Sequence, residues 1–306
     1  MTGPEPTPRR RGWRGLAAAA ALVAALPTFT HARIIHEESS LYSRILVDQR
    51  GSLVCMQFSV RRDQRNQSCY DKRRPRDMVF IYARMMMAGL LLNPQPSRIL
   101  MIGLGGGTLP MALGELYPQA EMHVVEIDPA VVRVAREYFG FDPSPRVRVF
   151  TQDGRVFVKR AVQRGEAYDL IMLDAFNGDY IPEHLMTREF LEEVASLLTP
   201  DGVLAANTFS ISRLYDHESV TYDAVFGPFF NLRTPSTGNR VILTAADGLP
   251  DQQTLKARAE ELGPALKRYG IRMSELLPLM RQKRDWDVTA RELTDQYAPA
   301  NVLQAQ

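Results

Sequence analysis

Five short, continuous apolar runs, each followed by a predicted helix, constrain the fold of this 306-residue chain more than any other feature. The runs occupy residues 99–102, 122–127, 147–150, 170–173 and 203–206. The predicted helices lie near residues 109–117, 130–139, 155–163, 187–198 and 218–226. Short runs without polar alternation are typical of strands that helices cover on both faces. Their alternation with helices predicts an α/β fold with a parallel sheet.

A glycine-rich turn follows the first run and leads into the first predicted helix. Its sequence is Gly103-Leu104-Gly105-Gly106-Gly107. Glycines allow a sharp turn and a close approach to a ligand, and the helix start offers free amides. Glu126 lies near the end of the second run, about 20 residues further on, where a carboxylate can accept from ribose hydroxyls. The glycine turn and Glu126 together predict a nucleoside-binding site. NAD-binding proteins share this combination, and the alternative is a tight turn that binds no ligand.

Acids also follow the third and fourth runs. Asp153 stands in Gln152-Asp153-Gly154, and Asp174 comes directly after residue 173. Open α/β sheets bind ligands outside the carboxyl ends of their strands, so both acids are expected near the glycine turn. The alternatives are that Asp153 only caps the following helix and that Asp174 is a solvated loop acid.

Together with the segment 197–202, these motifs resemble the class I AdoMet-dependent transferases, and within them the spermidine synthase (polyamine aminopropyltransferase) family. The resemblance covers residues 42–299 and implies a Rossmann-like fold with a mostly parallel seven-stranded sheet. The donor-binding residues that it implies are Gly103, Gly105 and Gly107 in the loop, Glu126 at the ribose diol and Asp153 at the adenine amino group. The implied co-substrate is decarboxylated S-adenosylmethionine or S-adenosylmethionine, without a metal.

The same resemblance implies three catalytic residues. Asp174 matches the first acid of an Asp-x-x-Asp-Pro signature, whose carboxylate accepts a proton from the attacking amine. Asp179 is the candidate for the second acid, two places late. Tyr82 matches the tyrosine of an upstream Tyr-x-Glu-x-x-x-His element, in which Arg84 replaces the glutamate and the histidine is missing. This loss of a carboxylate predicts poor binding of putrescine, a diamine with two positive charges.

A further departure concerns the donor. The family's glycine loop contains an acid where this chain has Gly106. An acid there would repel the carboxylate of intact S-adenosylmethionine. Gly106 therefore predicts that the intact compound binds at least as well as the decarboxylated one.

Residues 1–32 have the three parts of an export signal. Arginines extend up to Arg14, an apolar run covers residues 16–26, and a small-residue cleavage site ends at Ala32. The expected location is the periplasm, with a cytoplasmic protein as the alternative. The apolar run is too short for a bilayer core of about 30 Å, so no permanent membrane span is expected. Cys55 and Cys69 either pair after export or remain two unpaired core residues.

The predicted domain organisation follows from these segments. It consists of a signal peptide at 1–32, an N-terminal β-hairpin subdomain with a linking helix at 33–95, the nucleoside-binding domain at 96–246 and a helical tail at 247–306. The hairpin rests on alternating stretches at 43–47 and 53–58, and the linking helix on the apolar segment 78–92.

The leading functional hypothesis is a transferase of polyamine biosynthesis that moves an aminopropyl group from an adenosyl sulfonium donor to a small amine. A methyltransferase acting on a small molecule and a non-catalytic exported binding protein are the alternatives, because fold alone does not determine function. Nucleic acid is not an expected partner, since basic and acidic side chains nearly balance beyond the arginine-rich start. Homodimer formation is left open.

Overall fold

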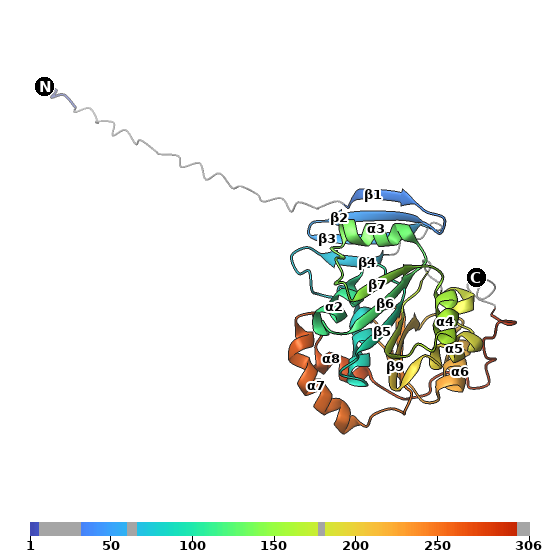
Figure 1. Cartoon of the computed structure of the whole chain (residues 1–306). Coiled ribbons are helices and arrows are strands. Elements are labelled where there is room, and N and C mark those ends of the chain that lie inside the picture. Colours follow the sequence, from blue (N-terminus) through green and yellow to red (C-terminus); the bar gives the residue numbers. More distant parts are fainter. Residues whose placement is uncertain (6–31, 60–65, 177–180, 299–306) are drawn as a thin grey trace. The chain divides into compact units, whose positions relative to one another are not determined.

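The computed structural model describes residues 1–5, 32–59, 66–176 and 181–298. Its larger sheet has seven strands in the order β10-β11-β9-β8-β5-β6-β7 (Figure 1). The parallel strands are β5 (Arg98–Ile102), β6 (Glu121–Glu126), β7 (Val147–Thr151), β8 (Tyr168–Leu173) and β9 (Leu198–Phe209). The antiparallel edge consists of β10 (Phe230–Arg233) and β11 (Asn239–Ala245). The predicted mostly parallel seven-stranded sheet is confirmed.

Helices cover both faces of this sheet, and side chains of β5 alternate between the two apolar cores. Ile99 and Met101 face one core and Leu100 and Ile102 the other, and all four are buried. The first core includes side chains of α2 (Thr108–Leu116) and α7 (Gln252–Lys267). The second includes α4 (Gly154–Gln163), α5 (Arg188–Ala195) and α6 (Tyr215–Phe226). Burial on both faces explains why the strand sequences are continuously apolar.

The order of the strands creates a topological switch point between β5 and β8. The chain leaves β5 toward β6 and β7 on one side, then returns to β8 and continues to β9 on the other. At this point Ile102 pairs with Leu173, so the residues that follow both strands emerge side by side. Open α/β sheets bind ligands at such a point, outside the carboxyl ends of the strands.

The smaller sheet is antiparallel and has the order β1-β2-β3-β4. Its strands are β1 (Arg33–Ser39), β2 (Arg44–Arg50), β3 (Leu53–Ser59) and β4 (Asn66–Asp71). The predicted hairpin corresponds to β2 and β3, whereas β4 lies in a charged stretch that the sequence did not mark as a strand. Cys55 and Cys69 occupy paired positions on β3 and β4 and form a disulfide. Apolar residues of β2 and β3 pack against α3 (Pro129–Tyr138), which Figure 1 shows alongside this sheet.

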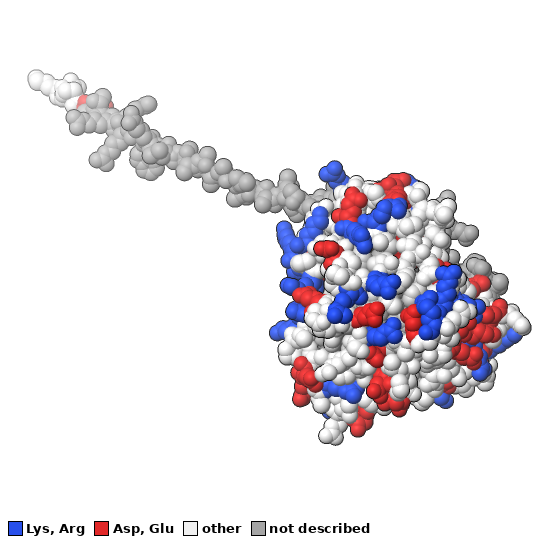
Figure 2. Space-filling model, in the orientation of Figure 1, with Lys and Arg blue, Asp and Glu red and all other residues white. Residues whose placement is uncertain are grey.

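Two predicted helices are shorter than their apolar patterns. The segment 78–92 contains the single helix α1 (Ile81–Met86), which continues as a 3-10 helix at Met87–Leu91. The C-terminal tail contains α7, then α8 (Met273–Leu276) and a 3-10 turn at Leu277–Leu279. Among the helices of the described residues, none is long and apolar enough to cross a membrane. On the face that Figure 2 presents, acidic and basic side chains are interspersed.

Candidate active site

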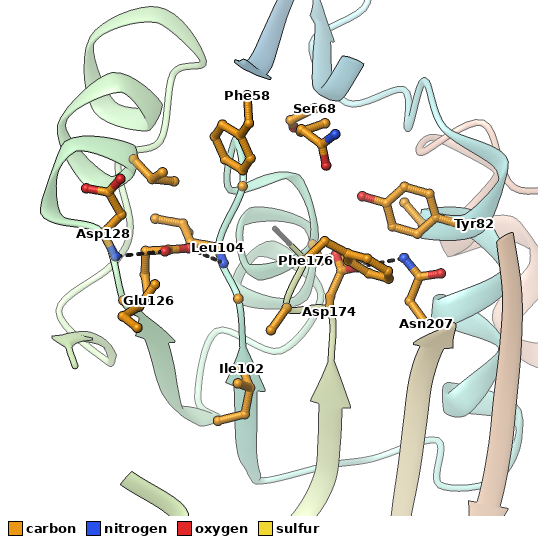
Figure 3. Close-up of a pocket in the computed structure, with 18 of the residues that line it drawn as sticks. Phe58, Ser68, Tyr82, Ile102, Leu104, Glu126, Asp128, Asp174, Phe176 and Asn207 are labelled. Carbon is orange, nitrogen blue, oxygen red and sulfur yellow. Dashed lines mark hydrogen bonds between the residues drawn. The ribbon is translucent and has the colours of Figure 1, made fainter. Parts of the chain in front are cut away.

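A cavity of about 350 Å³ lies at the carboxyl ends of β5, β6, β8 and β9 and is bordered by β3 and β4 of the smaller sheet. Figure 3 shows Glu126 and Asp128 on one side, Tyr82 and Asn207 on the other, and Asp174 with Phe176 between them. The cavity therefore lies where the strand order reverses, as the sheet topology requires.

Gly103 is the first residue after β5 and allows the close approach of the β8 end. Its φ is +100°, and a Cβ atom there would lie 2.2 Å from the carbonyl oxygen of Asp174. The Gly103 amide donates to the carbonyl of Val125 at 2.8 Å, and the Asp174 amide donates to the carbonyl of Ile102 at 2.8 Å. A side chain at position 103 would force these strand ends apart, so glycine is required here.

The other two predicted loop glycines have different places. Gly105 lines the cavity and has a φ of +53°. Gly107 has a φ of +79° and directly precedes α2, and a Cβ atom there would lie 2.4 Å from the ring of Phe141. Gly107 does not line the cavity. The role of Gly107 at a donor therefore stays a prediction. Because Gly107 has no side chain, the turn can pack closely against Phe141.

Glu126 ends β6 at the floor of the cavity, where backbone amides hold both of its carboxylate oxygens. Oε2 accepts from Leu104 at 3.1 Å and Oε1 from Asp128 at 3.0 Å. Burial raises the pKa of Glu126 to about 6, although these backbone hydrogen bonds counteract the increase. The carboxylate is thus fixed in orientation, and its remaining lone pairs can accept from a ligand.

Asp174 follows β8 and lies at the bottom of the cavity beside Tyr82 and Asn207. The Asn207 amide donates to Asp174 Oδ1 at 2.8 Å, and the Tyr82 hydroxyl also hydrogen-bonds the carboxylate. Burial raises the pKa of Asp174 to about 7, partly offset by these two hydrogen bonds. The same burial raises the pKa of Tyr82 well above its ordinary value, so Tyr82 stays protonated as a donor. A carboxyl with a pKa near 7 is well suited to accept a proton at neutral pH.

Asp153 borders the cavity, and each of its oxygens already has a partner. Oδ1 accepts from the Val156 amide at 2.9 Å and caps α4, as the structural alternative predicted. Oδ2 lies 2.8 Å from His184 Nε2, and this contact lowers the pKa of Asp153. His184 also lines the cavity. The sequence did not indicate this histidine, because 31 positions separate it from Asp153.

Two expectations about charge at the site, at Gly106 and Arg84, require correction, and a third, at Asp179, is not tested. Gly106 does not line the cavity, and a Cβ atom there would lie 2.6 Å from Ser68 Oγ and 2.8 Å from the ring of Phe139. Position 106 therefore has no room for a side chain facing a donor. Arg84 does not line the cavity either, because its Nε donates to the Met78 carbonyl at 2.7 Å. Asp179, the predicted second acid, lies outside the described residues.

Several lining residues were absent from the sequence prediction. Asn207 and Phe209 belong to the end of β9, and Asn239 belongs to β11. The Asn239 amide donates to Asn207 Oδ1 at 3.1 Å, and Thr237 Oγ1 donates to Asn239 Oδ1 at 2.8 Å. Asn207 could have been found, since it directly follows the fifth apolar run. In the described part of the chain, no group of three or more His, Cys, Asp or Glu could hold a metal ion.

Comparison with known proteins gives the family. Residues 79–226 match the Spermine/spermidine synthase domain. Over 272 residues the chain is 53% identical to a polyamine aminopropyltransferase of Vibrio vulnificus strain CMCP6, covering 88% of this chain and 91% of the relative. The alternatives of a methyltransferase and a non-catalytic binding protein are not favoured.

The predicted export of the protein is wrong. The homologous polyamine aminopropyltransferases are cytoplasmic enzymes, and the cytoplasmic alternative agrees with them. An arginine-rich, apolar start satisfied the pattern of a signal peptide, but the pattern depends only on composition and order along the chain. Residues 6–31 lie outside the described residues.

Solved structures with this fold include both aminopropyl and methyl transferases. A spermidine synthase in complex with the transition-state analogue AdoDATO has a TM-score of 0.65 at 22% identity and covers 83% of this chain and 86% of that one. Human methyltransferase-like protein 13 in complex with SAH has a TM-score of 0.57 at 28% identity, with coverages of 68% and 96%. The similarity to the Vibrio protein, which extends over 88% of this chain, decides between them: this chain belongs to the polyamine aminopropyltransferase family of spermine and spermidine synthases.

Proposed function

We propose that the protein transfers an aminopropyl group from decarboxylated S-adenosylmethionine to an amine, with Asp174 as the base. One observation carries this proposal: a carboxyl with a raised pKa adjoins the glycine turn and lies in the same cavity as Glu126. A proton acceptor and a nucleoside site in one cavity are what an amine nucleophile and an adenosyl donor require.

Electrostatics of the lining favour the decarboxylated donor. The acidic and basic side chains among the described lining residues are those of Glu126, Asp128, Asp153, Asp174 and His184, and no Lys or Arg is among them. Decarboxylated S-adenosylmethionine has two positive charges, on sulfur and on the amino group. Intact S-adenosylmethionine adds a carboxylate, which has no Lys or Arg partner on this lining. This argument replaces the preference for the intact donor that Gly106 had suggested.

The geometry of the turn supports the proposed donor residues. Glu126 would accept from the ribose hydroxyls, because backbone amides of Leu104 and Asp128 already fix its carboxylate. Gly103 and Gly105 would allow the backbone to approach the donor, and Gly107 would begin α2. Asp153 would meet the adenine edge, with His184 holding its outer oxygen.

In the reaction, the amine nitrogen attacks the carbon next to the sulfonium. The new carbon–nitrogen bond forms as the carbon–sulfur bond breaks, and the sulfur leaves as the neutral thioether 5′-methylthioadenosine. The proton that the nitrogen loses goes to Asp174, while Tyr82 and Asn207 keep the carboxylate oriented. Holding the nucleophile in line with the leaving sulfur supplies the rest of the rate enhancement. Asp179 remains a proposed second acid.

A product assay tests the proposal. The full-length protein is incubated with each donor in turn and a mixture of amines, and nucleoside and amine products are separated by mass spectrometry. We expect 5′-methylthioadenosine and an aminopropylated amine from the decarboxylated donor. Release of S-adenosylhomocysteine from the intact donor, without 5′-methylthioadenosine from the other, would contradict the proposal and identify a methyltransferase.

Two organisational proposals accompany this function. The segment 33–95 contributes lining residues from β3, β4 and α1, and the segment 96–246 contributes the donor turn and the base. We therefore propose that these two segments form two parts of one site. The segment 247–306 would be a tail, and its helix α7 packs on the first core. Homodimer formation is tested by sedimentation of the purified protein.

A further inference from the structure

A fully buried ion pair joins β11 to α6, and the proposed reaction does not use it. The side chain of Arg240 on β11 is 0% exposed, and its Nη2 donates to Oε2 of Glu218 on α6 at 2.9 Å. Nε of Arg240 donates to Thr208 Oγ1 at 2.7 Å, and Nη1 donates to Ser219 Oγ at 2.6 Å. The guanidinium also lies over the ring of Tyr215, 4.2 Å from its centroid. Each nitrogen of the guanidinium thus has a partner within the protein.

Stability alone does not explain such a pair. Two buried charges lose their hydration, and apolar side chains of similar volume often give an equally or more stable fold. Ile242 and Tyr222, which follow Arg240 on β11 and Glu218 on α6, belong to the second apolar core. A charged cluster whose donors all have partners fixes one arrangement of the elements that it joins.

Side chains at this end of β9 and β11 alternate between the two faces of the sheet. Arg240 pairs with Thr208, and their side chains meet on the face that α6 covers. The preceding residues on the two strands, Asn239 and Asn207, line the cavity on the other side. The pairing ends one residue further, where Asn239 lies opposite Phe209. The ion pair therefore fastens the two strands beside both amides and next to the strand ends, which open most readily.

The two amides form a chain to the base. The Asn207 amide nitrogen donates to Asp174 Oδ1 at 2.8 Å (Figure 3). The Asn239 amide nitrogen donates in turn to Asn207 Oδ1 at 3.1 Å. Behind Asn207, side chains leave a second cavity of about 20 Å³, which Thr208 and Glu218 also line. Because packing does not fill this space, the direction of the Asn207 amide depends on its hydrogen bonds and on the strand that carries it.

From this arrangement we infer that Arg240 is a positioning residue, which holds the ends of β9 and β11 so that the Asn207 amide faces Asp174. It acts through Thr208 on β9 and through Glu218 on α6. The inference rests on the proposed function, because it takes Asp174 as the proton acceptor. It adds a residue outside the cavity to those that determine how the base is held.

Loss of this support should weaken the hydrogen bond to the base. Burial raises the pKa of Asp174, and the hydrogen bonds from Asn207 and Tyr82 lower it. The nearby Glu126 carboxylate adds to the increase. A misdirected Asn207 amide should therefore raise the pKa of Asp174 further, because the ionised carboxylate loses more than the protonated form.

The test removes both charges together, so that the net charge near the base is unchanged. Arg240→Met alone leaves Glu218 buried without a cation, and its midpoint of unfolding in denaturant should fall strongly. The double variant Arg240→Met/Glu218→Met should recover most of that midpoint. Its pH profile of kcat/KM should nevertheless move upward by about 0.5 to 1 pH unit. Its affinity for 5′-methylthioadenosine should change less than about threefold. A folded double variant with the wild-type profile would overturn the inference.

Two further variants complete this test. Arg240→Lys keeps the ion pair, but a single ammonium cannot reproduce the separate contacts of the guanidinium. It should fold and move the profile in the same direction by less, and a wild-type profile would count against the inference even if the double variant does not fold. Arg258→Met is the control, since Arg258 donates to the carbonyls of Leu91 and Leu92 and does not line the cavity. It should lower the midpoint of unfolding without moving the profile. An equal shift in Arg258→Met would refute a specific role of Arg240.

A titration without turnover separates this inference from the proposed function. The protein is isotopically labelled at the aspartate carboxyl carbons, and the NMR signal that Asp174→Asn lacks belongs to Asp174. If no amine is aminopropylated, the proposed function fails, yet a higher pKa of Asp174 in the double variant still supports Arg240 as a positioning residue. An unchanged pKa of Asp174 in the folded double variant rejects this role, whether or not turnover is observed.

Discussion

The cavity has two sides that are built in different ways, a proposed donor half and a proposed acceptor wall. The donor half contains Glu126, Asp128 and Asp153, and the acceptor wall contains Tyr82, Phe176, Asn207, Phe209 and Asn239. The donor half lies at the ends of three adjacent strands, β5, β6 and β7, and backbone amides hold the carboxylate of Glu126 there. The acceptor wall combines side chains from α1, β9, β11 and the segment after β8. A site that binds a constant cofactor-like donor can be encoded locally, whereas the acceptor surface depends on segments that meet only in the folded chain.

Asp174→Asn is the sharpest test of this division, because Asp174 lies where the two halves meet. An amide keeps the shape of the side chain but cannot take the proton, so kcat should fall about 100- to 10,000-fold. The affinity for 5′-methylthioadenosine, measured by calorimetry, should change less than about threefold. A kcat within tenfold of the wild type would assign the base elsewhere.

Gly103→Ala tests whether the local turn supports the donor half. Its control is Gly165→Ala, which has a φ of +64° but open space around the added Cβ atom. Both variants lose about 1 to 2 kcal/mol from the left-handed backbone conformation. Only Gly103→Ala also forces an atom against the Asp174 carbonyl, so its free energy of unfolding should fall by at least about 3 kcal/mol in denaturant titrations. Equal losses of unfolding free energy in the two variants would contradict the close approach of Gly103 to the Asp174 carbonyl.

Glu126→Ala should damage the donor half alone. Loss of an acceptor for the ribose hydroxyls costs roughly 1 to 3 kcal/mol, or about tenfold or more in affinity for 5′-methylthioadenosine. The amine KM should stay within about threefold of the wild type. Glu121→Ala, at the opposite end of β6, is the matched control and should leave both unchanged. A shift in amine KM as large as the loss of nucleoside affinity would break the distinction between the halves.

The pH dependence of the rate tests how the acceptor wall orients the base. The pKa of Asp174 is raised to about 7, and the ionised form is the proton acceptor, so kcat/KM should increase as pH rises through 7. Asn207→Leu removes a hydrogen bond that lowers this pKa, and the profile should move to higher pH by about one pH unit.

The pH profiles of wild type and variant are compared with the same amine. The ionisation of the amine then affects both profiles equally and does not contribute to their difference. Asn239→Ala is the control for this shift, because its amide contacts Asn207 and not the carboxylate. Its profile should move less than that of Asn207→Leu. An unchanged profile in Asn207→Leu would mean that the apparent pKa does not belong to Asp174.

The sequence alone determined the parallel sheet and the edge at which its candidate acids lie. Strand and helix periodicity is a local property, and residues that directly follow parallel strands must emerge at one edge, so Glu126, Asp153 and Asp174 could be expected there. The same locality explains the false prediction of export, since the match of residues 1–32 to a signal peptide rested on composition and order along the chain alone.

Only the tertiary structure decided the acceptor wall and the surroundings of the turn. Gly106 resembled a donor-facing position, yet Ser68 and Phe139, from other parts of the chain, fill the space next to its Cα. Likewise, Asn239 reaches the base through Asn207 because β11 pairs with β9 in a register that places Asn239 opposite Phe209. Such contacts join residues about 30 or more positions apart, and packing between distant segments, not local propensity, selects them.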